Sequence, residues 1–81
     1  MGKRDKLIQK FLRRPPSVRF DEVASLLKSF GFIEARVRGS HHTFRRDLDG
    51  LIITVPKKHG QVVKRTYVIQ IIELLDLENN G

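Results

Sequence analysis

Three short segments between residues 33 and 56 constrain the fold of this chain most strongly. In "FIEARVRG" the residues Ile33, Ala35 and Val37 alternate with charged residues, which is the period of a strand with one buried face. "HHTFRR" follows a Gly-Ser pair, and "LIITVP", rich in β-branched residues, follows the turn signal "DLDG" and ends at Pro56. Because the connections are short, we expect three strands in one antiparallel sheet.

Helical patterns flank these strands on both sides. Residues 17–30 carry apolar residues at helical spacing, acidic residues in the first turn, and Gly31 as a C-terminal stop. After the loop "KKHGQ", Thr66 is expected to cap a final helix, whose apolar residues are Val68, Ile71, Ile72 and Leu75. The order helix, three antiparallel strands, helix predicts a two-layer α+β domain. Helices would cover one face of the sheet and leave the other face open.

The N-terminal segment is expected to be a short helical extension. Residues 4–13 place Leu7, Ile8, Phe11 and Leu12 on one side, and Pro15 and Pro16 end the pattern. This extension would pack either on the body of the protein or on a partner. We therefore divide the chain into an extension at 1–16, a domain at 17–78 and a tail at 79–81.

Composition excludes several classes of protein. With 81 residues the chain has room for one small domain. It has no cysteine, which excludes disulfides, thiolate metal sites and cysteine nucleophiles. No apolar run is long enough for a transmembrane helix, and the basic N-terminus lacks the apolar centre of a signal peptide. We expect a cytoplasmic protein without a cofactor.

Positive charge is concentrated in the middle of the chain. The formal net charge is +7, and against the central basic residues stand only Asp47 and Asp49. This distribution indicates a localised positive surface for nucleic acid or an acidic partner, although many small proteins are basic for solubility alone. The central basic residues are Arg36, Arg38, Arg45, Arg46, Lys57, Lys58, Lys64 and Arg65.

The two adjacent histidines of "GSHHTFRR" are expected to point to opposite faces of their strand. Phe44 is the only large apolar residue there, so it should face the helices, and His42 shares its parity. His41 should lie on the open face with Thr43 and Arg45. Because neighbouring strand residues diverge, the pair is poorly placed to share a metal ion, and His59 is the only other histidine. We expect no metal site.

His41 is the candidate for chemistry. An imidazole near neutral pH can act as a general base or acid, and nearby cations can hold a phosphodiester. These are the parts that metal-independent RNA cleavage needs. The histidine would activate the ribose 2′-hydroxyl, and cleavage would leave a cyclic phosphate and spare DNA, which lacks that hydroxyl. The alternative is that His41 is a solvated histidine at a strand end. Gly39 likewise has two interpretations, a close contact for phosphate or an ordinary turn residue. The candidate RNA contacts are Gly39, Ser40, Arg36, Arg38, Arg45, Lys57, Lys58, Lys64 and Arg65.

These motifs, taken in order, resemble one protein family. "LLKSFGFIEARVRGSHHTFRRDLDGLIITVPKKHG", followed by "VVKRTYVIQIIELLDL", is similar to the HicA (YcfA-like) toxins over about residues 20–77. The resemblance implies a double-stranded-RNA-binding-like fold and an mRNA interferase of a type II toxin–antitoxin pair, neutralised by a HicB antitoxin. It places the catalytic histidine of the Gly-Ser-His motif on His41 and the motif's glycine on Gly39. Residues 1–16 have no counterpart in the family pattern.

Two further functions remain open beside the toxin ribonuclease. A non-catalytic RNA-binding module of the same fold would use the same basic face, and a protein-interaction domain would offer that face to an acidic partner. The basic cluster is single and central, whereas duplex readers span about 16 base pairs with separated contacts. A short single-stranded RNA is therefore the expected target.

Overall fold

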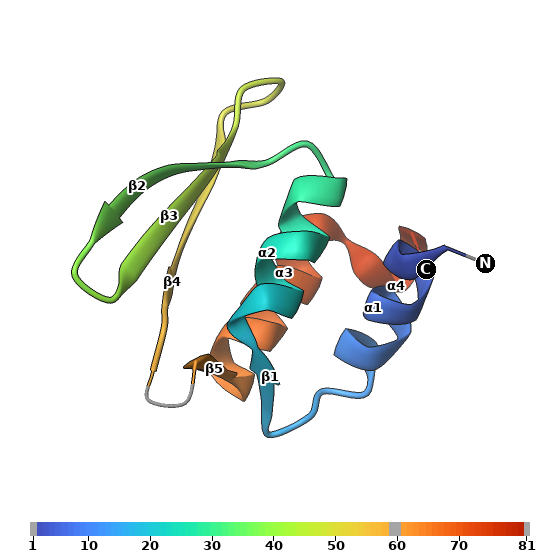
Figure 1. Ribbon diagram of the computed structural model, residues 1–81. Coiled ribbons are helices and arrows are strands. Elements are labelled where there is room, and N and C mark those ends of the chain that lie inside the picture. The colour runs from blue at the N-terminus through green and yellow to red at the C-terminus, as the bar shows by residue number, and fades with distance from the viewer. Residues whose placement is uncertain (1, 59–60, 81) are drawn as a thin grey trace.

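The three central segments form one antiparallel sheet. In the computed structural model, which describes residues 2–58 and 61–80, β2 (Ile33–Arg38), β3 (His41–Arg46) and β4 (Leu51–Pro56) pair in the order β2-β3-β4. Two helices, α2 (Phe20–Ser29) and α3 (Arg65–Leu75), lie on one side of this sheet (Figure 1). The α+β fold class predicted from the sequence is confirmed, and it is consistent with a double-stranded-RNA-binding-like domain.

The core lies between the sheet and these helices. From the sheet, Phe44 and Val55 are fully buried and Ile53 is nearly so. From α2, Val23 and Leu27 join the same apolar cluster. Phe44 therefore points toward the helices, as its strand parity predicted, and the parity of its strand neighbours is fixed with it.

Helix α1 (Lys3–Leu12) is built into this core. Leu7, Ile8 and Phe11 are buried in the same cluster as the sheet residues, and α1 packs against α2, α3 and the short helix α4 (Leu77–Asn80). Figure 1 shows α1 and α4 on the side of α2 and α3 that faces away from the sheet. Of the two placements considered for this segment, packing on the body is therefore the one observed.

A strand pair that the sequence did not predict connects the N-terminal part to the last helix. Ser17–Arg19 forms β1, which pairs antiparallel with β5 (Val62–Lys64) through Val18 and Val63, both buried. The predicted helix over 17–30 was thus wrong in its first turn, and α2 begins at Phe20. The carboxylate of Glu22 accepts the Arg19 backbone N–H at 2.9 Å and satisfies the start of this helix.

The predicted cap of the last helix was also wrong. Lys64 occupies the N-cap position of α3 and makes no side-chain cap bond, so Thr66 lies one residue inside the helix. The backbone continues directly from β5 into α3, and the Arg65 N–H bonds to the Pro16 carbonyl at 2.9 Å. This bond satisfies the Arg65 N–H, one of the backbone donors at the start of a helix that a capping side chain would otherwise have to satisfy.

The alternation in β2 does not report a buried face. All six residues of β2 are exposed, including Ile33 at 48% and Val37 at 53%. The pairing with β3 shifts register between Glu34 and Arg36, so Ala35 lies in an irregularity of the ladder. Such a bulge moves later residues to the opposite face. The expectation that Ile33, Ala35 and Val37 share one buried face was therefore wrong.

A glycine stop and an arginine clamp fix the sheet to α2. Gly31 has a φ of +91°, its N–H bonds to Lys28, and the Phe32 N–H bonds to Leu27, which is a Schellman ending. Arg46 donates to the Phe30 carbonyl at 2.9 Å and binds Asp49 through two nitrogens. The hydrogen bond between the two side chains raises the pKa of Arg46 and lowers the pKa of Asp49. Arg46 therefore stabilises the join between α2 and the β3–β4 turn.

Candidate functional site

The open face of the sheet is the candidate site, and the strand pairing defines its nine positions. Directly paired residues of an antiparallel sheet project to the same face, and Phe44 marks the opposite one. Three rows of three therefore lie on the open face. The rows are Arg38–His41–Pro56, Arg36–Thr43–Thr54 and Ile33–Arg45–Ile52, of which Pro56 is buried at the end of β4.

His41 lies at the hairpin end of this face. Its side chain is exposed and has no hydrogen bond or ion pair with any residue that the structure describes. Across the ladder its partner on β2 is Arg38, and such paired residues hold their Cβ atoms about 5 Å apart. A free imidazole thus lies next to a guanidinium, on the face that parity predicted.

Gly39 and Ser40 form the two-residue turn that brings Arg38 and His41 together. Gly39 has a φ of +60°, as the first central position of a type II′ hairpin turn requires. A Cβ added there would meet nothing within 4 Å, so the backbone conformation and not space selects glycine. The Ser40 carbonyl accepts the Lys57 N–H at 2.8 Å, which ties this turn to the end of β4.

His42 has a different environment from its neighbour. It lies on the helix side, where its Nδ1 is 2.9 Å from the Glu34 carboxylate and its ring is 4.4 Å from that of Phe20. Only 13% of its side chain is exposed. The structure therefore divides the two histidines into a free one and a packed one, as alternation predicted.

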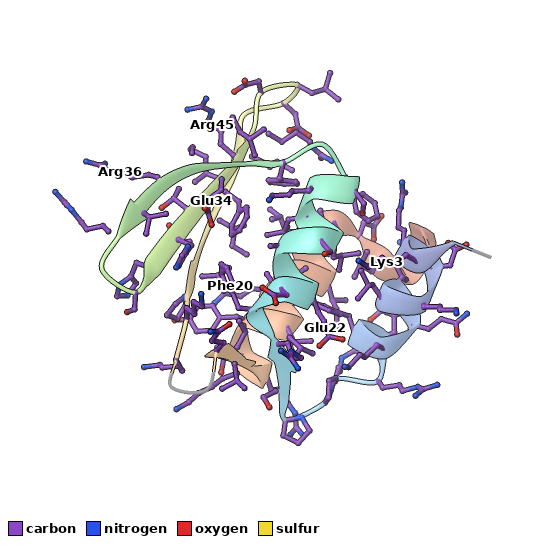
Figure 2. The ribbon with its side chains drawn as sticks, viewed as in Figure 1. Lys3, Phe20, Glu22, Glu34, Arg36 and Arg45 are labelled. Carbon is purple, nitrogen blue, oxygen red and sulfur yellow. The ribbon has the colours of Figure 1, made fainter. Side chains whose placement is uncertain are left out.

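The cations of the open face are not equivalent. Arg36 and Arg38 are exposed, and neither side chain has a partner among the described residues. Arg45 is bound to Asp47, with Nε to Oδ1 at 2.7 Å, which reduces its availability for an anion. No carboxylate occupies any of the nine positions. Among the described residues, Arg36 and Arg38, on the ladder beside His41, are therefore the unpaired arginines of this face; Figure 2 shows Arg36 and Arg45 on the sheet.

The remaining candidate contacts divide into two groups. Lys57 and Lys58 follow β4 at the His41 end, and the Lys57 ammonium lies 5.2 Å from the centre of the Phe20 ring. Lys64 and Arg65 belong to the β1–β5 region instead, where Arg65 donates to the Pro15 carbonyl at 3.4 Å. His59 and Gly60 lie outside the described residues.

Two features of the open face were not recognised from the sequence. Thr43 and Thr54 join their hydroxyls at 3.0 Å in the middle row, next to Arg36. Ile33 and Ile52, at 48% and 58% exposure, flank Arg45 in the far row. The strand parity of "LIITVP" contains the signal for Thr54 and Ile52, but the bulge in β2 concealed Ile33. The face thus grades from a charged end at His41 to a more apolar end.

Among residues 2–58 and 61–80, no three or more histidine and acidic side chains are grouped so that they could hold a metal ion. Nor does any helix of those residues have the length and apolar character needed to cross a membrane.

Comparisons with known proteins identify the family. No curated protein and no solved structure matches the chain. The sequence model of the family described as "HicA toxin of bacterial toxin-antitoxin" matches residues 20–77, from the start of α2 through α3 to the first residue of α4. This match includes the whole open face and most of the chain, and it leaves α1 outside. The chain therefore belongs to the HicA toxin family, the toxin components of bacterial toxin–antitoxin systems.

Proposed function

We propose that this HicA family member is a metal-independent mRNA interferase that cleaves single-stranded RNA at the open face, in the cytoplasm. One observation carries the proposal. His41 is exposed and free of described partners, beside Arg38 and one row from Arg36, on a face whose nine strand positions hold no carboxylate. An imidazole that no structural contact occupies, next to cations that can hold phosphate, has the components that acid–base cleavage of RNA requires.

His41 acts first as a general base. Its neutral imidazole takes the proton of the ribose 2′-hydroxyl, and the resulting oxygen attacks the adjacent phosphorus. The bond from phosphorus to the 5′-oxygen breaks, and that oxygen leaves with a proton from solvent or from an acid at the site. The products are a 2′,3′-cyclic phosphate and a 5′-hydroxyl. DNA is not cut because it lacks the attacking hydroxyl.

Arg36 and Arg38 hold the phosphate and stabilise its added charge. Guanidinium groups bind phosphate oxygens in pairs, and negative charge accumulates on those oxygens as the 2′-oxygen attacks. Gly39 and Ser40 offer backbone at the turn, and Lys58 extends the positive region beyond it. Lys57 is a weaker contact, because its ammonium lies over the Phe20 ring on the helix side. Arg45, Lys64 and Arg65 are weaker contacts in this proposal, since Arg45 and Arg65 already bind other groups of the chain.

We also propose that the antitoxin paired with this toxin is a HicB-like protein. A toxin of this family is paired with an antitoxin. None of the described helices and strands covers the open face, which carries net positive charge, so an acidic surface placed over it would exclude RNA from His41. Competition between such a protein and RNA for the purified chain would measure this directly.

The chemistry is tested by the substrate and the product ends. The purified chain is incubated in EDTA with a single-stranded RNA, with DNA of the same sequence, and with RNA carrying 2′-deoxy sugars at the cleaved positions. The proposal requires cleavage of the first substrate only, with a 2′,3′-cyclic phosphate on the upstream product. Binding without cleavage would favour a non-catalytic RNA-binding module, and cleavage that needs a divalent cation would exclude the mechanism.

A further inference from the structure

Helix α1 carries a second, separate run of positive charge. Lys3 and Lys6 of the helix and Arg13, its C-cap, are exposed, and none has a side-chain partner among the described residues. At 3.6 residues per turn these three positions fall within an arc of about 80° and extend over about 15 Å of the helix axis. We call these three residues the basic stripe. Lys10 lies on the same side but is bound to Glu22 at 2.6 Å, and Asp5 lies beyond the edge of the arc.

The opposite side of α1 is already occupied by the core. Leu7, Ile8 and Phe11 are 8%, 2% and 0% exposed. An amphipathic helix that binds a membrane needs its apolar side for the lipid, and here that side is buried against α2, α3 and α4. The outward charge of α1 therefore fits a polyanion that it contacts through charge alone.

The basic stripe is remote from the open face. Figure 1 shows α2 and α3 between the sheet and α1, and Figure 2 places Lys3 on the other side of the molecule from Arg36 and Arg45. A ligand bound at His41 therefore reaches α1 only if it is long enough to pass around α2 and α3. The longest extent of the protein is 33 Å, which sets the scale of that path. The family match also begins after α1, at residue 20.

We propose that the basic stripe of α1 is a second RNA-binding surface, which contacts the phosphate backbone of a long single-stranded RNA whose scissile region lies on the open face. The proposal rests on the proposed function, because that function brings RNA to this chain. Exposed cations without a defined pocket suit a repeating phosphate backbone, whereas a protein partner is usually held by a buried apolar or aromatic anchor. Two linked contacts on one strand raise its apparent affinity without any new contact at the site.

The test separates short from long RNA. In the His41→Ala background, binding is measured for RNAs of about 6 and about 30 nucleotides, the shorter being within the length that one small domain occupies. The triple variant K3Q/K6Q/R13Q keeps the core intact, because the three side chains are exposed, and unfolding followed by circular dichroism checks this. On single strands each phosphate contact contributes about 0.7 to the slope of log affinity against log salt concentration. The contribution of three contacts to the affinity therefore falls about 20-fold between about 50 and 200 mM salt.

The proposal expects the triple variant to bind the long RNA more weakly, with a reduced salt slope, and the short RNA unchanged. The matched variant R36Q/R38Q should weaken both RNAs. Equal binding of the long RNA by triple variant and parent would overturn the proposal, and so would an equal loss on both lengths. Displacement of long RNA from the stripe by polyglutamate at equal charge concentration would instead assign the surface to an acidic protein. Because RNA binding is measured here without cleavage, a result against the basic stripe as an RNA contact can be told apart from a result against the proposed nuclease activity.

Discussion

Replacing Phe11 by alanine tests whether α1 is an integral part of the fold. Phe11 is 0% exposed and belongs to the one apolar cluster that includes Phe44 and Val68. Truncating a fully buried phenylalanine to alanine costs about 3–5 kcal/mol, from lost burial and the cavity left behind. A chain of 81 residues has a total stability of about 4–12 kcal/mol. The variant should therefore lose a large part of the stability of the whole protein.

Thermal and urea unfolding followed by circular dichroism measure this loss. For a domain of this size about 1 kcal/mol corresponds to about 4–8 °C in Tm, so the Phe11→Ala transition should fall by at least about 12 °C. Leu48→Ala is the control, because Leu48 is 89% exposed and its truncation should change stability by less than about 0.5 kcal/mol. If the two variants unfold alike, α1 does not contribute to the core and the reasoning from burial fails.

Three further predictions concern the turns and caps. Gly39→Ala should cost about 1–2 kcal/mol in urea unfolding, because an L-residue is strained at a φ of +60°; no loss would show that the turn relaxes. Thr66→Ala should change stability by less than about 0.5 kcal/mol, since Thr66 makes no cap bond, and a loss of about 1 kcal/mol or more would restore its capping role. The hydrogen bond from Arg46 lowers the pKa of Asp49, so its stabilisation is present above the unfolded pKa and is lost as the pH falls below about 4. Tm measured against pH should therefore fall less steeply in acid for Asp49→Asn than for the native chain, and identical profiles would contradict this linkage.

The parts of the fold that depend on local signals were predictable from the sequence. Helix α2 has apolar residues at helical spacing and a glycine at the position that needs positive φ. The hairpin of β2 and β3 follows from a Gly-Ser pair between two extended segments. Because Phe44 alone could fill the core, it fixed the parity of β3, and with it the separation of His41 from His42.

The parts that depend on long-range contacts were not predictable. Ser17–Arg19 has no pattern of its own long enough to specify a strand, and its pairing with Val62–Lys64 joins residues more than forty positions apart. The bulge at Ala35 is equally invisible, since period two continues through it in the sequence while the faces exchange. Ile33 stays exposed because it lies on the open face, and all six residues of β2, an edge strand, are exposed.

The candidate site follows the same division. Parity was enough to place His41, Thr43 and Arg45 on the open face, and the polar parity of β2 placed Arg36 and Arg38 beside them. Only the folded structure separates cations that are unpaired among the described residues from cations that bind their own chain. Arg45 binds Asp47, and Arg65 binds the Pro15 carbonyl. Counting basic residues in a sequence cannot make that distinction, because each pairing depends on where the chain turns.

Cleavage and binding by the His41→Ala variant, measured side by side, test the proposed function most directly. A long single-stranded RNA is incubated in EDTA with the native chain and with the variant, and the products are separated on a denaturing gel. Binding of both proteins to an uncleavable 2′-deoxy analogue is measured in parallel. We expect cleavage by the native chain, none by the variant, and nearly equal binding by both. Cleavage by the variant at the native rate, or no cleavage by either protein, would contradict the assignment of His41 as the catalytic base.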